Sequence, residues 1–98
     1  VGLLTADEIA FAGGVFSTAN STYYIKGNTI SGFWWAFSPG YFYDGSTGVW
    51  DVSGAGYLGR GRVDGNIGVR PSLSLVSNIK ISSGTGTGTA TNPYKIAF

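Results

Sequence analysis

The clearest helix signal in the sequence lies near its beginning. Thr5 and Glu8 are spaced as in a capping box, in which the Thr5 hydroxyl accepts from the Glu8 amide and the Glu8 carboxylate accepts from the Thr5 amide. Apolar residues follow, and Gly13 and Gly14 form a natural stop. We predict a helix over residues 6–12, which is too short to be stable alone and must pack on another element.

Beyond the helix, apolar and polar residues alternate with the period of two that indicates β-strands. The aromatic run at residues 33–38 is bulky on both faces, which predicts a central strand, and Pro39 predicts its end. Residues 44–48 are expected to form a loop, and Pro71 is expected to bend or end a strand. The other predicted strands are residues 23–25, 49–53, 57–63, 67–70 and 79–82, of which 49–53 and 57–63 form a hairpin around residues 54–56.

The second arm of this predicted hairpin has two different faces. Leu58, Arg60 and Arg62 share one face, and glycines dominate the other. We expect the two arginines on a solvated sheet face or a charged sheet edge. The alternative is contact with an anionic glycan or a partner surface.

These elements predict one short helix packed on a twisted, mostly antiparallel sheet, which is an α+β fold dominated by strands. We assign residues 1–82 to a single domain, residues 83–92 to a Gly/Thr-rich loop or linker, and residues 93–98 to a terminal strand of the same domain. Residue 1 is Val rather than Met, so we expect a mature product or a part of a longer polypeptide.

Composition excludes several classes of site. The 98 residues include no Cys and no His, which excludes zinc fingers, iron–sulfur clusters, disulfide scaffolds and catalysis by either residue type. A net charge of +1 lacks the basic excess of nucleic-acid-binding domains. No apolar run approaches the roughly 20 residues of a membrane-spanning helix. We therefore predict no cofactor, no nucleic-acid partner and no membrane insertion of this segment, and we assign no metal ligands.

Five short motifs occur in order over nearly the whole chain. They are Leu-Leu-Thr-Ala-Asp-Glu at residues 3–8, Ala-Gly-Gly at 12–14, Trp-Ala-Phe-Ser-Pro at 35–39, Gly-Val-Arg-Pro at 68–71 and Asn-Pro-Tyr-Lys-Ile at 92–96. Together they resemble a C-terminal module of bacterial surface proteins, some with pilin-like N-termini, and of related phage proteins. The resemblance implies a C-type-lectin-like fold.

The resemblance also limits the chemistry that it implies. In sulfatase-modifying and retroelement-diversified relatives of this fold, a Gly-x-Arg segment lies on a late core strand, where Gly68 and Arg70 stand here. The chain lacks the disulfide cysteines and the Glu-Pro-Asn and Trp-Asn-Asp tripeptides of sugar-binding animal lectins, so their calcium-dependent sugar capture is not implied. The catalytic cysteines of the sulfatase-modifying enzymes are missing as well.

Aromatic and polar residues beside the glycine-rich turns are the candidates for a binding site. Aromatic rings stack on sugar rings and carboxylates accept from hydroxyl groups, whereas the alternative role for each ring is core packing. Asp44, with Asp51 nearby, could ligate calcium through its carboxylate, but the alternative role of Asp44 is to form a turn. The Asp-Gly sequence at residues 44–45 favours the turn. We predict that the ligand-binding residues are Tyr41, Tyr43, Asp44, Trp50, Asp51 and Tyr57, aided by the hairpin tip at residues 53–57.

Four other residues are predicted to stabilise the fold rather than to bind a ligand. Thr5 and Glu8 cap the helix. Arg70 is expected to tie its strand to the helix start or to a loop carbonyl, with Asp7 or Glu8 as its partner. Trp35 is assigned to the core.

The acidic residues predict that the protein is not an enzyme, because most of them cap the helix or lie in turns and offer no catalytic pair. Our first hypothesis is a non-enzymatic recognition or adhesion module outside a bacterial cell or on a virion, which binds a glycan or a host surface. The alternative is a structural or assembly module, such as a pilus tip or a phage tail or capsid decoration. Its aromatic surface would then contact other proteins in a homo- or hetero-oligomer.

Overall fold

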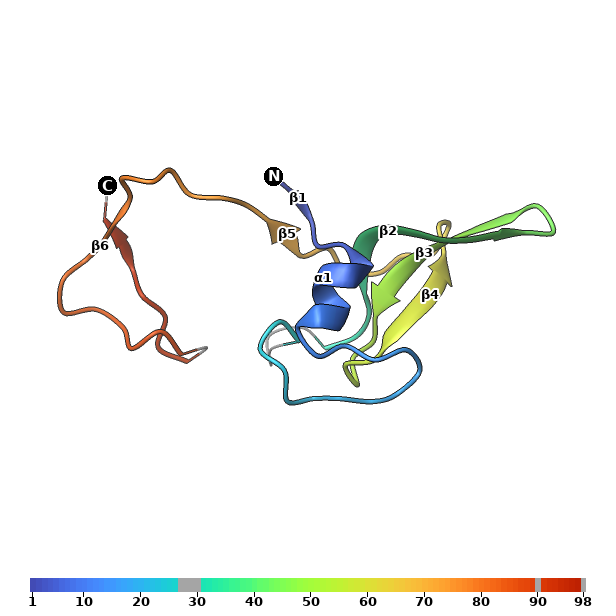
Figure 1. Ribbon diagram of the computed structural model, residues 1–98, viewed down its shortest axis with the longest axis horizontal. Coiled ribbons are helices and arrows are strands. Elements are labelled where there is room, and N and C mark those ends of the chain that lie inside the picture. Colours follow the sequence, from blue (N-terminus) through green and yellow to red (C-terminus); the bar gives the residue numbers. More distant parts are fainter. Residues whose placement is uncertain (27–30, 90, 98) are drawn as a thin grey trace.

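The computed structural model describes residues 1–26, 31–89 and 91–97, and it has the predicted α+β architecture with one short helix and mostly antiparallel strands (Figure 1). Ala90 and Phe98, in the predicted loop and terminal strand, lie outside the described residues. None of the helices described is long and apolar enough to cross a membrane. The elements are β1 (Gly2–Leu3), α1 (Ala6–Phe11), β2 (Trp34–Tyr43), β3 (Ser46–Val52), β4 (Leu58–Arg62), β5 (Pro71–Ser72), β6 (Lys80–Ile81) and β7 (Ile96–Ala97).

Helix α1 has the predicted capping box. The Thr5 amide donates to Glu8 Oε2 at 2.8 Å, and the Glu8 amide donates to Thr5 Oγ1 at 3.2 Å. The helix ends at Phe11, one residue earlier than predicted, with Ala12 as its C-cap. Ile9 is fully buried and Phe11 is exposed, so the helix packs on the sheet through one face only.

Replacing Thr5 with alanine is expected to lower the free energy of unfolding by about 1 kcal/mol, because it leaves the Glu8 amide without its acceptor. Urea denaturation of both proteins measures the difference. Thr91→Ala, at an exposed threonine far along the chain, is the matched control and should change stability little. Equal losses in the two variants would contradict a capping role for Thr5.

The main sheet has three antiparallel strands in the order β2-β3-β4. Asp44 and Gly45 join β2 to β3, and their φ angles of 49° and 70° have the positive signs that a type I′ turn requires. The loop predicted over residues 44–48 is therefore wrong, because residues 46–48 already pair with β2. The connection of β3 to β4 is the predicted hairpin.

Strand β2 differs from its prediction in length and position. It does not end at Pro39 but continues to Tyr43, because the pairing with β3 shifts register on both sides of Pro39 and so accommodates the missing N–H. It is also an edge strand of the three-stranded sheet and not a central one. Its outer edge is partly covered, since the Trp35 amide donates to the Gly68 carbonyl and the Phe37 amide to the Leu4 carbonyl.

Two other predicted strands are wrong. Residues 23–25 form a turn in which the buried Tyr23 ring enters the core and its hydroxyl donates to the Gly56 carbonyl at 2.9 Å. Residues 67–70 form a single bridge from Gly68 to Trp34. Pro71 begins β5 rather than ending a strand, and it pairs with Leu3 of β1. This position suits proline, because the first residue of a strand need not donate to the ladder.

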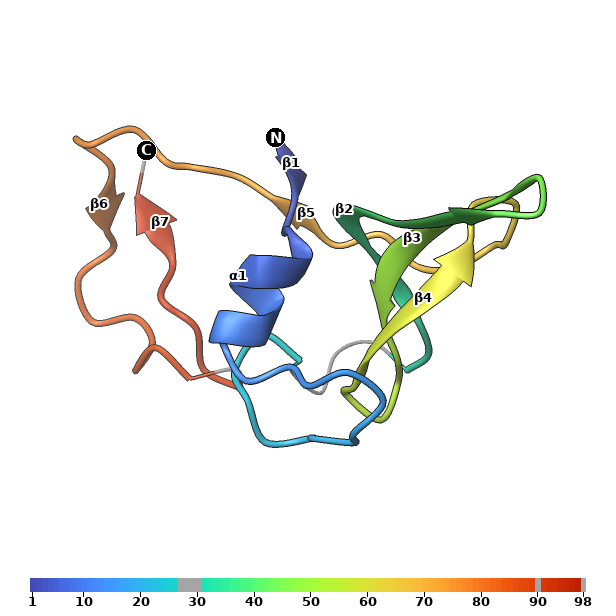
Figure 2. The same cartoon turned by 45° about the vertical axis from the view of Figure 1, so that its right-hand side comes forward.

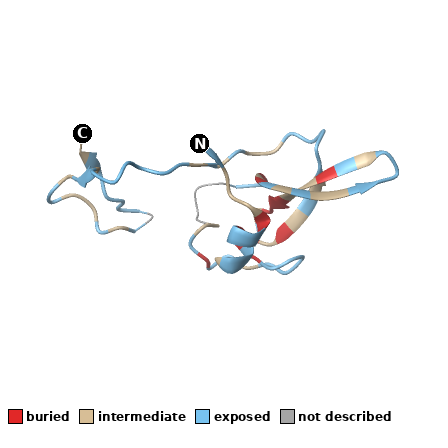
Figure 3. Cartoon of the chain, turned by 45° about the horizontal axis from the view of Figure 1, so that its top comes forward, coloured by how far each residue is buried: buried red, intermediate tan, exposed pale blue. Residues whose placement is uncertain are grey.

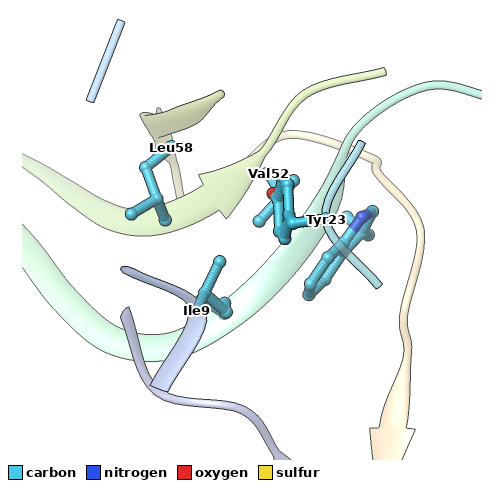
Figure 4. Packing of buried hydrophobic residues seen from close by; sticks show 6 residues of the cluster. Ile9, Tyr23, Val52 and Leu58 are labelled. Atoms are coloured by element: carbon cyan, nitrogen blue, oxygen red, sulfur yellow. The ribbon is translucent and has the colours of Figure 1, made fainter. Parts of the chain in front are cut away.

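The core lies between α1 and the sheet. Trp34 is 1% exposed whereas Trp35 is only partly buried, so the assignment of Trp35 to the core was wrong. Strand alternation explains this, because Trp34 and Ala36 point toward the helix and Trp35 points to the other face. The buried cluster consists of Ile9, Tyr23, Trp34, Ala36, Val52 and Leu58 (Figure 4).

The C-terminal arm, residues 73–89 and 91–97, extends away from the main sheet. In Figures 1 and 2 it lies at the opposite end of the molecule from the β2–β3 hairpin, and the molecule is 54 Å long. Strands β6 and β7 pair with each other in a sheet of their own. Every described residue of the arm is exposed or half-buried (Figure 3).

Candidate functional site

An open groove of about 630 Å³ runs along the edge formed by β4. Its lining combines residues from β2, β3 and β4 with residues from the two loops that flank them. Consecutive β4 residues point to opposite faces of the sheet, so the groove draws on both faces of this edge strand. The lining residues are Phe16, Ser17, Phe33, Tyr41, Tyr43, Asp51, Tyr57, Gly59, Arg60 and Gly61.

Asp51 occupies the part of the groove beside the glycines of β4. It pairs with Gly59 across the strands, and its side chain is only 4% exposed. A Cβ atom at Gly59 would lie 2.6 Å from Asp51 Oδ1, and one at Gly61 would lie 2.6 Å from Oδ2. The two glycines therefore provide the space that the carboxylate fills.

The Asp51 carboxylate has no compensating partner among the described residues. Its Oδ1 atom is buried without a hydrogen bond. Loss of hydration on burial raises the pKa of Asp51 above its ordinary value. A buried acceptor in this state is costly to the folded protein, and a donor or a cation from a ligand would recover part of that cost.

Aromatic rings form the walls of the groove. Phe33 and Tyr57 meet edge to face on the Asp51 side, with ring centroids 6.4 Å apart. Phe16 packs edge to face against Trp50 on the other side of the sheet, at 5.6 Å. The Tyr41 ring covers Gly48, where a side chain would leave it no room.

Arg60 lies among the rings on the Phe16 side. Its guanidinium carbon is 5.0 Å from the centre of the Phe16 ring, 5.5 Å from Trp50 and 6.0 Å from Tyr41. These distances are those of cation–π contacts, which hold the charge over the ring faces. Arg60 is exposed on the edge strand β4, as predicted, and its guanidinium also packs on these rings.

The groove brings together four of the six residues that the sequence predicted as ligand-binding, namely Tyr41, Tyr43, Asp51 and Tyr57. The other two lie outside the lining. Trp50 is half-buried behind Phe16, and Asp44 is exposed in the hairpin turn beyond Tyr43.

The hairpin tip at residues 53–57 is mostly unavailable for recognition. Gly56 is buried, and a Cβ atom there would collide with the Asn20 backbone carbonyl. The Asn20 amide also donates to the Ala55 carbonyl. Of the predicted tip, Tyr57 is the residue that lines the groove.

Sequence reasoning missed Phe16 and Phe33 as lining residues, and it considered Arg60 only as an alternative contact with a glycan or a partner. Phe16 follows the helix in a segment without strand periodicity, and its neighbour in space is Leu58, far along the chain. Strand alternation could have placed Phe33 on the face of Asp51, because Trp35 pairs with Asp51 and residues two apart share a face.

The other two arginines, Arg62 and Arg70, lie outside the groove lining. The Arg70 side chain donates to the backbone carbonyls of Ile25 and Lys26, and its guanidinium lies 5.0 Å from the Trp34 ring centre. The expectation that Arg70 binds a loop carbonyl is therefore confirmed. The expectation that it pairs with Asp7 or Glu8 is wrong, and the Glu8 carboxylate accepts from the Thr5 amide in the capping box instead.

Arg62 forms an exposed ion pair with Asp64, with nitrogen and oxygen 2.8 Å apart. This hydrogen bond holds the pKa of the Asp64 carboxyl below its ordinary value. In the described part of the chain, no group of three or more His, Cys, Asp or Glu residues converges on a metal site. The groove itself contains one carboxylate, that of Asp51.

Comparisons of this chain with family models, with curated proteins and with solved structures found no match.

Proposed function

We propose that this domain is a non-enzymatic recognition module that binds a glycan in the groove along β4. The observation that carries the proposal is the buried carboxylate of Asp51, whose Oδ1 has no partner among the described residues and which lies in one groove with the paired rings of Phe33 and Tyr57. Aromatic rings pack against the apolar faces of sugar rings, and a carboxylate accepts from hydroxyl groups. The single carboxylate favours binding over glycoside hydrolysis, which ordinarily needs two.

The setting that we propose is extracellular, on a bacterial cell surface or on a virion, with a C-type-lectin-like fold. Its support is the ordered series of motifs together with one capped helix packed on an antiparallel sheet. The low content of charged residues and the many Gly, Ser, Thr and Tyr residues also resemble the composition of binding surfaces.

A glycan array tests this function directly. Tyr57→Ala should lower affinity for the retained glycan on the order of tenfold, since it removes one ring of the Asp51 wall. Tyr43→Ala should weaken binding as well. Tyr24→Ala removes a ring that is 80% exposed and outside the groove lining, so it should bind like the unmodified protein. Unchanged binding by both groove variants would remove the site.

The second candidate function is assembly into a larger structure, and the C-terminal arm favours it. A separate two-stranded sheet is only marginally stable in water, and apolar side chains exposed together often mark a protein interface. The exposed apolar residues of the arm are Leu73, Leu75, Val76, Ile81, Tyr94 and Ile96.

Native mass spectrometry of the whole chain separates the two functions. A stable symmetric oligomer, dissociated by the double change Leu73→Ser and Leu75→Ser, would support assembly. A monomer that retains affinity for a saccharide would support recognition alone.

A further inference from the structure

We propose that the ligand of the groove carries a positively charged amino group that binds beside Asp51, and that the ligand is a saccharide with a free, non-acetylated amine. This inference rests on the proposed glycan-binding function and specifies the chemistry of its ligand. It makes Asp51 the residue that determines specificity.

The first support is the distribution of charge around the groove. Asp51 is 96% buried, yet the one ion pair among the described residues joins Arg62 to Asp64 instead. Arg60 is held over the Phe16, Tyr41 and Trp50 rings, and Arg70 is bound to carbonyl groups beside Trp34. Arg60 and Arg70 are therefore engaged by other groups and do not neutralise Asp51. We infer that a cation from the ligand binds the Asp51 carboxylate.

The second support is the aromatic wall beside the carboxylate. Phe33 and Tyr57 stand edge to face at the Asp51 end of the groove. The faces of such rings carry partial negative charge and attract ammonium groups, most strongly where water is excluded. The Tyr57 ring lies beside Gly59, against which Asp51 Oδ1 also packs, so an ammonium group at the carboxylate would have an aromatic ring close by.

Alternative substituents at the same position of a sugar fit less well. A hydroxyl group donates a hydrogen bond to Asp51 but brings no charge, and an N-acetyl group also lacks the charge. A carboxylate would be repelled by Asp51. The space for the Asp51 side chain depends on Gly59 and Gly61, whose missing Cβ atoms let its oxygens lie against β4.

Isothermal titration of the full chain with four methyl glycosides tests the inference: those of glucosamine, N-acetylglucosamine, glucose and glucuronic acid. We expect the glucosaminide to bind roughly 10- to 100-fold more tightly than the other three, as for a charge-assisted hydrogen bond. Asp51→Asn should reduce its affinity to that of the glucoside. Asp7→Asn, at an exposed carboxylate on α1 outside the lining, is the matched control and should leave binding unchanged.

A second measurement reports the charge itself. The NMR pH titration of the bound glucosaminide should show its amine pKa raised by the unmodified protein and not by Asp51→Asn, an effect that a merely structural Asp51 would not produce. Tighter binding of a neutral or acidic glycoside, still dependent on Tyr57, would overturn the inference and leave glycan recognition standing. Failure of all four probes and of the glycan array would overturn both.

Discussion

Replacing Trp34 with alanine is expected to lower the free energy of unfolding by about 3–5 kcal/mol, the loss that follows truncation of a large buried ring. Trp34 is 1% exposed and belongs to the cluster that joins α1 to the sheet. Its ring also lies under the Arg70 guanidinium, and its backbone forms the bridge to Gly68. The truncation would therefore leave a cavity at the point where three separate segments meet.

A loss of that size is a large fraction of the stability of a 98-residue chain, whose total is on the order of 5–15 kcal/mol. Urea denaturation followed by circular dichroism measures it. Trp35→Ala is the matched control, because Trp35 is the adjacent tryptophan but only partly buried, and its loss should cost clearly less. A greater loss from Trp35 than from Trp34 would contradict the placement of the core.

Replacing Asp51 with asparagine is expected to raise the free energy of unfolding at neutral pH by about 1–3 kcal/mol, in contrast to most substitutions of buried residues. The Asp51 carboxylate is buried, and its Oδ1 has no hydrogen-bond partner. Asparagine has nearly the same shape and removes the buried charge. A stabilising change at a groove residue is also typical of a site that is kept for function rather than for stability.

The same change should alter how stability depends on pH. Burial raises the pKa of Asp51 above its ordinary value of 3.8, so the folded protein takes up a proton there more readily than the unfolded chain. The destabilisation by Asp51 is therefore absent below its unfolded pKa and complete once pH has risen above the folded pKa. The carboxylate packs against Gly59 and Gly61 of β4, and Arg60 is the other charged residue of the groove lining.

Denaturation of both proteins between about pH 3 and pH 7 measures this difference. The asparagine variant should gain its advantage as pH rises from the lower value to the higher one. Taking the difference between the two proteins cancels the effects of other carboxyl groups, including that of Asp64, whose pKa is shifted in the opposite direction. A difference that stays constant with pH would contradict a raised pKa at Asp51.

Local sequence signals predicted local structure well. The capping box of Thr5 and Glu8 fixed the start of α1, and Gly54 to Gly56 fixed the turn between β3 and β4. These features depend on residues that are neighbours in sequence, so their chemistry is visible in the sequence alone. The same holds for the alternation that places Gly59 and Gly61 on one face of β4.

Features that depend on distant segments were harder to predict. Pro39 does not end β2 because a register shift against β3 accommodates it, and no local signal reports that shift. The burial of Asp51 arises from its cross-strand position beside Gly59 and from the rings of Phe33 and Tyr57 in the same groove. The candidate site was therefore predictable in its three tyrosines, whereas Phe16, Phe33 and the buried state of the carboxylate required the tertiary structure.

NMR titration of the ¹⁵N-labelled chain with the saccharide most strongly retained on the array tests the central claim, that the groove along β4 is the binding site. We predict that the largest shifts occur at the backbone amides of Asp51, Tyr57, Gly59 and Gly61, with little change at Tyr24 and in the C-terminal arm. Shifts centred on α1 or on the arm, with the β4 amides unmoved, would contradict it.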